Sequence, residues 1–152
     1  MLYQPTNTTE LVQWLIPYYD IKVPAGFPSP ALDYMEVRID LNKELMPHPL
    51  ATFMVDCEGD SMIHAFVPPT AKLLIDRSLT AKDGDMVMAK LNGEYTIKFL
   101  KKNDVECWLC PANPNYPDIR VTPEMQMEVC GVVSRIIIDP KDVKHVRPGG
   151  RQ

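Results

Sequence analysis

The sequence predicts a mainly β protein with an extended N-terminal arm. Of its 152 residues, 15 are Pro and 7 are Gly, a balance that favours loops and extended segments over long helices. From Thr52 onward, short β-prone runs alternate with turn residues, as in all-β and β-rich domains. An Asn92-Gly93 pair between two of these runs is typical of a two-residue hairpin turn. One β-rich domain of ordinary size accommodates these observations.

We expect three parts along the chain: an arm over residues 1–31, a β-rich domain over residues 32–139 and a flexible polar tail over residues 140–152. The tail contains Pro, Gly and Arg but few apolar residues, so it has little to bury.

The arm combines one amphipathic stretch with a linker. Thr9 to Ile16 is apolar on one side, and we expect it to be helical up to Pro17. Asp20 to Pro30 contains three prolines, which exclude a regular helix and predict an extended linker. Residues 31–45 alternate apolar and charged side chains, which leaves strand and helix open, with a helical turn favoured at Leu41 to Leu45.

The β-rich domain contains seven candidate strands. Each is rich in β-branched, aromatic or other apolar residues and is bounded by turn signals. They are Thr52 to Cys57, Lys72 to Asp76, Met86 to Leu91, Glu94 to Leu100, Val105 to Leu109, Ile119 to Val121 and Met127 to Ile138.

A type I′ turn at Asn92-Gly93 predicts the register of the strands beside it. It pairs Leu91 with Glu94, and counting outward pairs Val87 with Lys98. A second turn at Asn103-Asp104 would then place Lys98 opposite Leu109. The side chains on the lysine's face of the sheet are therefore apolar: Val87, Ala89, Leu100 and Leu109.

Lys98 has no acidic residue directly opposite it in this register. Burial among apolar side chains disfavours the charged ammonium and lowers the pKa of a lysine. A neutral amine can then serve as a general base. The alternative is that Lys98 extends its ammonium to water at the edge of the sheet.

Three motifs in a fixed order point to a family. Ala25-Gly26 lies in the proline-flanked linker, Gly59-Asp60-Ser61-Met62 follows the first candidate strand, and Gly93 to Lys98 includes Thr96. Together they resemble the LexA/UmuD family of self-cleaving Ser-Lys proteins, peptidase S24. The resemblance extends through Asp33-Tyr34, Arg38 to Asn42, His48-Pro49, Leu73 to Ile75, Gly84-Asp85, Pro111 to Asn113, Tyr116 and Gly131 to Val133. Residues 64–72 depart from it, because they lack the Asp-Gly-Asp turn usual in the family.

The resemblance implies a LexA/signal-peptidase-like β-rich fold and a serine autopeptidase. Ser61 would be the nucleophile, Lys98 its general base, and the bond from Ala25 to Gly26 the one cleaved, which leaves 127 of the 152 residues. Gly59, Asp60 and Met62 would support the serine, and Thr96 is placed to orient the amine. The backbone N–H groups of Ser61 and its neighbour are candidate donors to the acyl oxyanion.

The resemblance also implies a role in SOS mutagenesis. The chain would form a homodimer, be stimulated to cleave itself by a RecA–DNA filament, and serve a UmuC-like DNA polymerase subunit in translesion synthesis. A formal charge of −4 and a pI near 5.3 argue against direct nucleic-acid binding. With no apolar run long enough to span a membrane and no charged leader, we expect a cytoplasmic protein without a membrane partner.

The sequence leaves two other functions open. The chain would be a dimeric, non-enzymatic binding module if Ser61 and Lys98 cleave nothing. It would be a LexA-like repressor fragment if a DNA-binding domain were missing, because only about 25 residues precede the linker. We expect no cofactor and no metal, since Cys107 and Cys110 would point to opposite faces of one strand. The histidines, His48, His64 and His145, are expected in loops or on the surface.

Overall fold

The computed structural model describes residues 14–31 and 33–142. They belong to two compact units, one ending at Pro47 and the other beginning at His48.

The first unit is a two-stranded antiparallel sheet followed by a helical turn. Strand β1 spans Leu15–Tyr19 and pairs with β2, Glu36–Asp40. Residues 20–31 between them form neither helix nor strand, as expected of the proline-containing linker. Helix α1 covers Leu41–Leu45, the turn that the sequence favoured, and the Asp40 carboxylate caps it by accepting from Asn42 N at 3.0 Å.

The helix expected over Thr9 to Ile16 is wrong where the structure describes it. Ile16 lies in strand β1 opposite Ile39, and Pro17 stands at the centre of the same strand opposite Arg38. In a two-stranded sheet each strand is an edge, so a proline can turn its nitrogen away from the partner without breaking the ladder. Residues 9–13 lie outside the described part of the chain.

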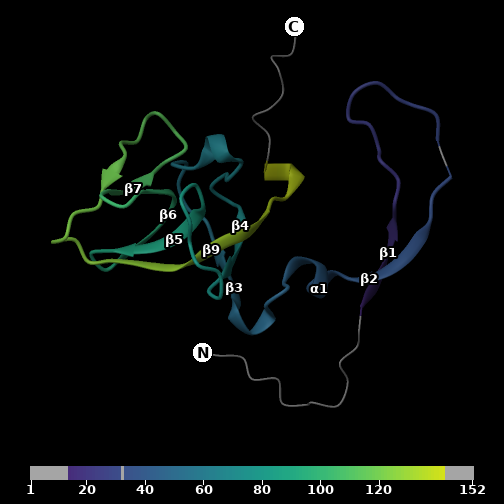
Figure 1. Ribbon diagram of the computed structural model, residues 1–152. Helices are drawn as coiled ribbons and strands as arrows, with labels where there is room; N and C mark the ends of the chain where they lie inside the picture. The colour runs from purple at the N-terminus through teal and green to yellow at the C-terminus, as the bar shows by residue number, and fades with distance from the viewer. Residues whose placement is uncertain (1–13, 32, 143–152) are drawn as a thin grey trace, which may run out of the picture. The chain divides into compact units, whose positions relative to one another are not determined.

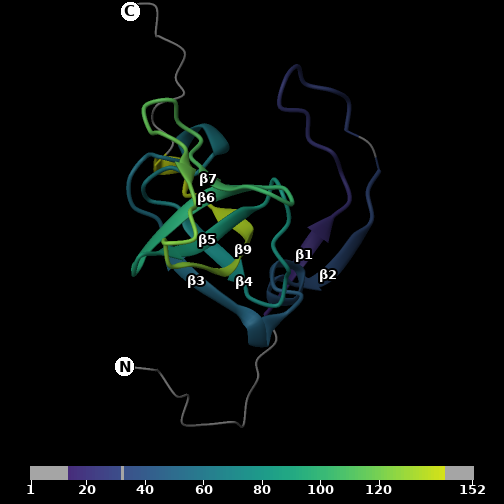
Figure 2. The ribbon, with the colours of Figure 1, turned by 60° about the vertical axis from the view of Figure 1, so that its left-hand side comes forward.

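The second unit is built on one antiparallel sheet. Its strands are β3 (Thr52–Asp56), β4 (Lys72–Asp76), β5 (Met86–Leu91), β6 (Glu94–Lys102), β7 (Cys107–Cys110), β8 (Ile119–Arg120) and β9 (Met127–Ile137). They pair in the order β3-β4-β9-β5-β6-β7-β8, so the long strand β9 lies between β4 and β5 (Figure 1). Figure 2 shows β5, β6 and β9 side by side from a second direction. The mainly β prediction is confirmed.

The turn at Asn92-Gly93 sets the register as predicted. Both residues have positive φ, 49° and 88°, as a type I′ turn requires. Val87 pairs with Lys98, and Ala89 with Thr96.

The register predicted for β6 and β7 is wrong by two residues. Leu109 pairs with Leu100 rather than with Lys98. The loop is longer than a two-residue turn because the Asn103 side chain closes it, accepting from the N–H groups of Val105 and Glu106 at 2.8 and 2.7 Å. A slip of two residues keeps each side chain on its face, so Leu109 still shares a face with Lys98.

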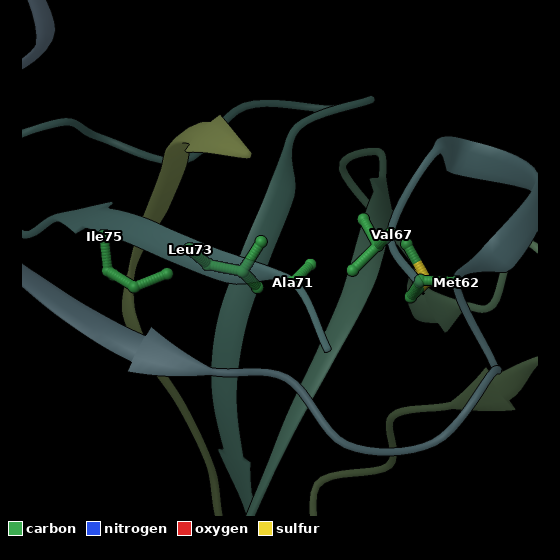
Figure 3. Packing of buried hydrophobic residues seen from close by; sticks show 5 residues of the cluster. All are labelled: Met62, Val67, Ala71, Leu73 and Ile75. Carbon is green, nitrogen blue, oxygen red and sulfur yellow. The ribbon is translucent and has the colours of Figure 1, made fainter. Parts of the chain in front are cut away.

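The core of the second unit reaches the serine motif. Met62, which directly follows Ser61, is 2% exposed and packs in one cluster with Val67, Ala71, Leu73 and Ile75 (Figure 3). Two of these residues come from β4, whereas Met62 and Val67 flank the 3-10 turn η2 (Ile63–Ala65). Burial of Met62 therefore attaches the serine motif to the sheet.

Two short 3-10 turns complete the unit. Turn η1 (Pro49–Ala51) precedes β3, and η3 (Pro140–Asp142) follows β9. The tail predicted to be flexible begins at residue 140, and its residues 143–152 lie outside the described part of the chain. Among the helices described, none has both the length and the apolar character that crossing a membrane requires.

Candidate active site

Ser61 lies in the turn between β3 and η2. The preceding residues, Gly59 and Asp60, lead away from the end of β3, and the buried Met62 holds the other side of the turn. The Ser61 side chain is half-buried and faces a cleft. The core thus presents the hydroxyl to the cleft by burying the next residue in the chain.

Lys98 reaches the same cleft from β6. Its Nζ lies 3.0 Å from Ser61 Oγ, 2.9 Å from Thr96 Oγ1 and 3.0 Å from the carbonyl oxygen of Ile97. Lys98 and Thr96 share a face because they are two residues apart on a strand. The structure therefore brings three of the predicted site residues, Ser61, Lys98 and Thr96, into one hydrogen-bonded group.

The amine of Lys98 is buried and has no acidic partner. Only 9% of the residue is exposed, and none of the ion pairs among the described residues includes it. Burial lowers the pKa of Lys98, and a smaller effect of Cys57 opposes this. The physical cause is the lost hydration of the charged form.

The neighbours of Nζ suit the neutral amine. A neutral amine has two N–H donors and one lone pair. The Ile97 carbonyl can only accept, and the Thr96 hydroxyl is able to accept, so these two take both N–H groups. The lone pair is then left for the hydroxyl proton of Ser61. This arrangement can activate a serine nucleophile without histidine or metal.

The cleft has a volume of about 370 Å³ and is formed by the end of β3, the serine turn and the first half of β6. Its lining includes the Cys57 thiol and the side chains of Val55 and Met88. Burial raises the pKa of Cys57, while the positive charge of Lys98 lowers it to a smaller extent. Cys57 therefore lines the cleft as a thiol whose ionisation is disfavoured by burial.

Backbone N–H groups beside the nucleophile are candidate oxyanion donors. Within the described residues, none of Asp60 N, Ser61 N and Met62 N donates a hydrogen bond to a backbone or side-chain group. All three belong to the turn that carries the nucleophile, as oxyanion donors do in acyl-transfer sites.

A comparison with models of protein families assigns the chain to a family. The model of the Peptidase S24-like family matches residues 17–134. The chain belongs to this family. Among its S24-like relatives, protein SamA of Salmonella typhimurium is 38% identical over 84% of this chain and 89% of its own length. Protein MucA of Escherichia coli is 35% identical over 82% of this chain and 85% of its own length. Protein ImpA of Shigella flexneri is 31% identical over 93% of this chain and 97% of its own length.

The two residues of the expected cleavage site lie in the first unit. Ala25 and Gly26 are both exposed and stand in the irregular linker between β1 and β2. No atom lies within 4 Å of the position that a Cβ would take at Gly26. The S24-like chain thus presents this bond on an exposed, uncrowded bend of the linker.

Sequence reasoning missed the contacts that hold Asp60. The Asn113 amide donates to the Asp60 carbonyl oxygen at 3.0 Å, and the Tyr116 hydroxyl donates to the Asp60 carboxylate at 2.6 Å. This hydrogen bond raises the pKa of Tyr116. Both residues stood in the resemblance, but only their position in the fold reveals the contacts with Asp60.

A polar cluster at the base of β4 was also missed. Asp76 is 1% exposed, and its carboxylate accepts from Ser78 Oγ at 2.6 Å and lies 2.7 Å from His48 Nδ1. Hydrogen bonds from Ser78 and His48 lower the pKa of Asp76 to about 2. His48 is in a loop as expected, but it is fixed to the core by this contact. His145 lies outside the described residues.

Proposed function

We propose that this chain is a UmuD-like SOS mutagenesis protein that cleaves its own Ala25–Gly26 bond. Ser61 is the nucleophile and Lys98 the general base, and a RecA–DNA filament stimulates the reaction. The observation that carries the proposal is the buried Lys98 amine, 3.0 Å from the Ser61 hydroxyl and without an acidic partner among the described residues. The truncated chain then joins an error-prone, UmuC-like translesion polymerase as a homodimer.

The proposed reaction is an acyl transfer to serine followed by hydrolysis. Lys98 takes the hydroxyl proton as Ser61 Oγ attacks the carbonyl carbon of Ala25, and the N–H groups of Ser61 and Met62 receive the developing oxyanion. The protonated Lys98 gives its proton to the departing amine of Gly26 as the peptide bond breaks. Lys98 then deprotonates the water that hydrolyses the ester, which regenerates the hydroxyl of Ser61.

One edge of β6 supports the binding of an extended substrate segment. Strand β7 pairs with β6 only from Phe99 to Lys102, so the half that carries Lys98 has no strand on that side among the described residues. Residues flanking a two-residue turn exchange both hydrogen bonds, so Glu94, Thr96 and Lys98 direct their backbone groups to β5. Tyr95 and Ile97 therefore direct theirs to the open side, where the linker can add as a strand.

The direct test is incubation of the purified chain at several pH values with mass measurement over time. We expect a 127-residue fragment beginning at Gly26, formed faster as the pH rises because deprotonation of Lys98 activates Ser61. Ser61→Ala should abolish the fragment, and Lys98→Ala should slow its formation by about 10²- to 10⁴-fold, the usual contribution of a general base.

Two results would contradict the proposal. Cleavage that is fastest near pH 5 and fades by pH 9 would exclude Lys98 as the base. An intact chain after days, even with RecA–DNA filament added, would exclude autoproteolysis and leave the dimeric binding module. Mixing a Ser61→Ala chain with an uncleaved active chain of distinguishable mass separates cleavage within one chain from cleavage between chains.

A further inference from the structure

The carbonyl groups of Asp60 and Ser61 both accept hydrogen bonds from one loop. The Asp60 carbonyl oxygen accepts from the Asn113 side-chain amide at 3.0 Å, in addition to a bond from Ile63 N at 3.2 Å within the turn. The Ser61 carbonyl oxygen accepts from Ala112 N at 2.8 Å. A return bond from His64 N to the Ala112 carbonyl oxygen, at 2.9 Å, connects the loop to η2. The loop from Ala112 to Tyr116 therefore holds the serine turn by the turn's own backbone groups.

These contacts determine where two N–H groups point. The Asp60 carbonyl and the Ser61 N–H belong to one planar peptide unit, and the Ser61 carbonyl and the Met62 N–H belong to the next. In a trans peptide the N–H points opposite to the C=O, and the described residues contain no cis peptide bond. Since both carbonyls point to the loop, the N–H groups of Ser61 and Met62 point away from it.

We propose that Asn113 is a positioning residue that, together with Ala112 N, orients the oxyanion donors of Ser61 and Met62 by holding the carbonyl ends of their peptide units. This inference rests on the proposed function and adds a role for a residue that touches neither the nucleophile nor the base. The amide of Asn113 suits the role because the residue is only 6% exposed and its two polar atoms have separate partners. Nδ2 donates to the serine turn, while Oδ1 accepts from Asn115 N at 3.0 Å and keeps the loop closed.

The two partners of Asn113 allow a selective substitution. Asn113→Asp keeps the oxygen that closes the loop and replaces the donor with a second acceptor facing the Asp60 carbonyl. Asn115→Asp is the matched control, because it makes the same chemical change two residues away at an exposed side chain. A carboxylate buried at residue 113 acts on Lys98 more strongly than an exposed, screened one at residue 115, so the rates are compared at high pH, where Lys98 is neutral in every variant.

We expect Asn113→Asp to slow autocleavage at least about tenfold at high pH, given that loss of one oxyanion donor costs about 10²–10³ in rate. The Asn115→Asp variant should cleave within about threefold of the unmodified chain at the same pH. In a non-cleaving Ser61→Ala background, residual dipolar couplings should report reoriented N–H vectors at residue 61 and Met62. The vectors of Thr96 and Lys98 should stay unchanged.

The outcomes separate this inference from the function on which it rests. If the unmodified chain releases no fragment beginning at Gly26, the proposed function fails and the inference with it. If the unmodified chain cleaves but Asn113→Asp cleaves within threefold of it, only the inference is overturned. A slower Asn113→Asp variant whose N–H couplings at residues 61 and 62 are unchanged would also overturn it.

Discussion

Replacing Thr96 with valine removes one of the three hydrogen-bond partners of the Lys98 amine with little change in volume. The Thr96 hydroxyl lies 2.9 Å from Nζ and stabilises both forms of the amine, but not equally. A hydrogen bond to a charged group contributes about 1.5–3 kcal/mol and one between neutral groups about 0.5–1.5 kcal/mol. Thr96→Val therefore destabilises the ammonium more than the neutral amine, by about 1 kcal/mol.

This difference predicts two opposite changes in autocleavage. Since about 1.4 kcal/mol corresponds to one pH unit, the half-maximal rate should move to lower pH by roughly half a unit to one unit. The maximal rate at high pH should fall by about three- to tenfold, because the neutral amine loses one of the two acceptors that orient its lone pair toward Ser61. The rate curves of the two proteins should therefore approach or cross at lower pH.

The measurement is the initial rate of release of the fragment beginning at Gly26, followed from about pH 6 to pH 10.5 in both proteins. Thr96→Ser, which keeps the hydroxyl, should restore the pH dependence of the unmodified chain. A half-maximal rate that stays in place or moves to higher pH in Thr96→Val would refute the assignment of Lys98 as the titrating base. An equal loss at every pH would show that Thr96 acts on the fold alone.

Three further predictions concern the framework of the site. Gly131→Ala should lower the free energy of unfolding by about 1–3 kcal/mol in urea titration. The reason is that the added Cβ would lie 2.6 Å from Ile75 Cγ2 and 2.9 Å from the Asp76 carbonyl oxygen. An unchanged urea midpoint would contradict the packing of β9 on β4. Met62→Ala should lower the free energy of unfolding by about 2–5 kcal/mol and abolish cleavage. Met54→Ala, at a residue that is 53% exposed, should lower it by less than about 0.5 kcal/mol. Equal losses of stability in the two variants would contradict the anchoring of Ser61 by the core. The pKa of Asp76 falls from 3.8 to about 2 on folding, so its stabilisation is complete above about pH 4 and is lost as the pH falls toward 2. Asp76→Asn should lower stability at neutral pH and flatten this acid dependence in circular dichroism, and a steeper dependence would refute the assignment.

The sequence alone determined the seven strands of the second unit and the hairpin that carries Lys98. Alternation of side chains and the positive φ required at Asn92 and Gly93 are local properties, so they predicted the pairing of Val87 with Lys98 that the structure confirms. The apolar neighbours of Lys98 followed from that register. The motif that contains Ser61 was found only through its resemblance to a family, because four residues in a turn have no local signature of chemistry.

Tertiary structure decided what local patterns leave open. Pro17 indicated the end of a helix, but pairing with Arg38 places it in an edge strand, where a missing N–H costs little. Ser61 and Lys98 are 37 residues apart in the sequence. Their close approach depends on the pairing of the sheet, which brings β6 near the end of β3. The contacts of Asn113 with Asp60, and of His48 with Asp76, likewise join residues 53 and 28 positions apart. Sequence periodicity reports which face a residue occupies, whereas the partner across the fold is chosen by packing and by the need to satisfy buried polar groups.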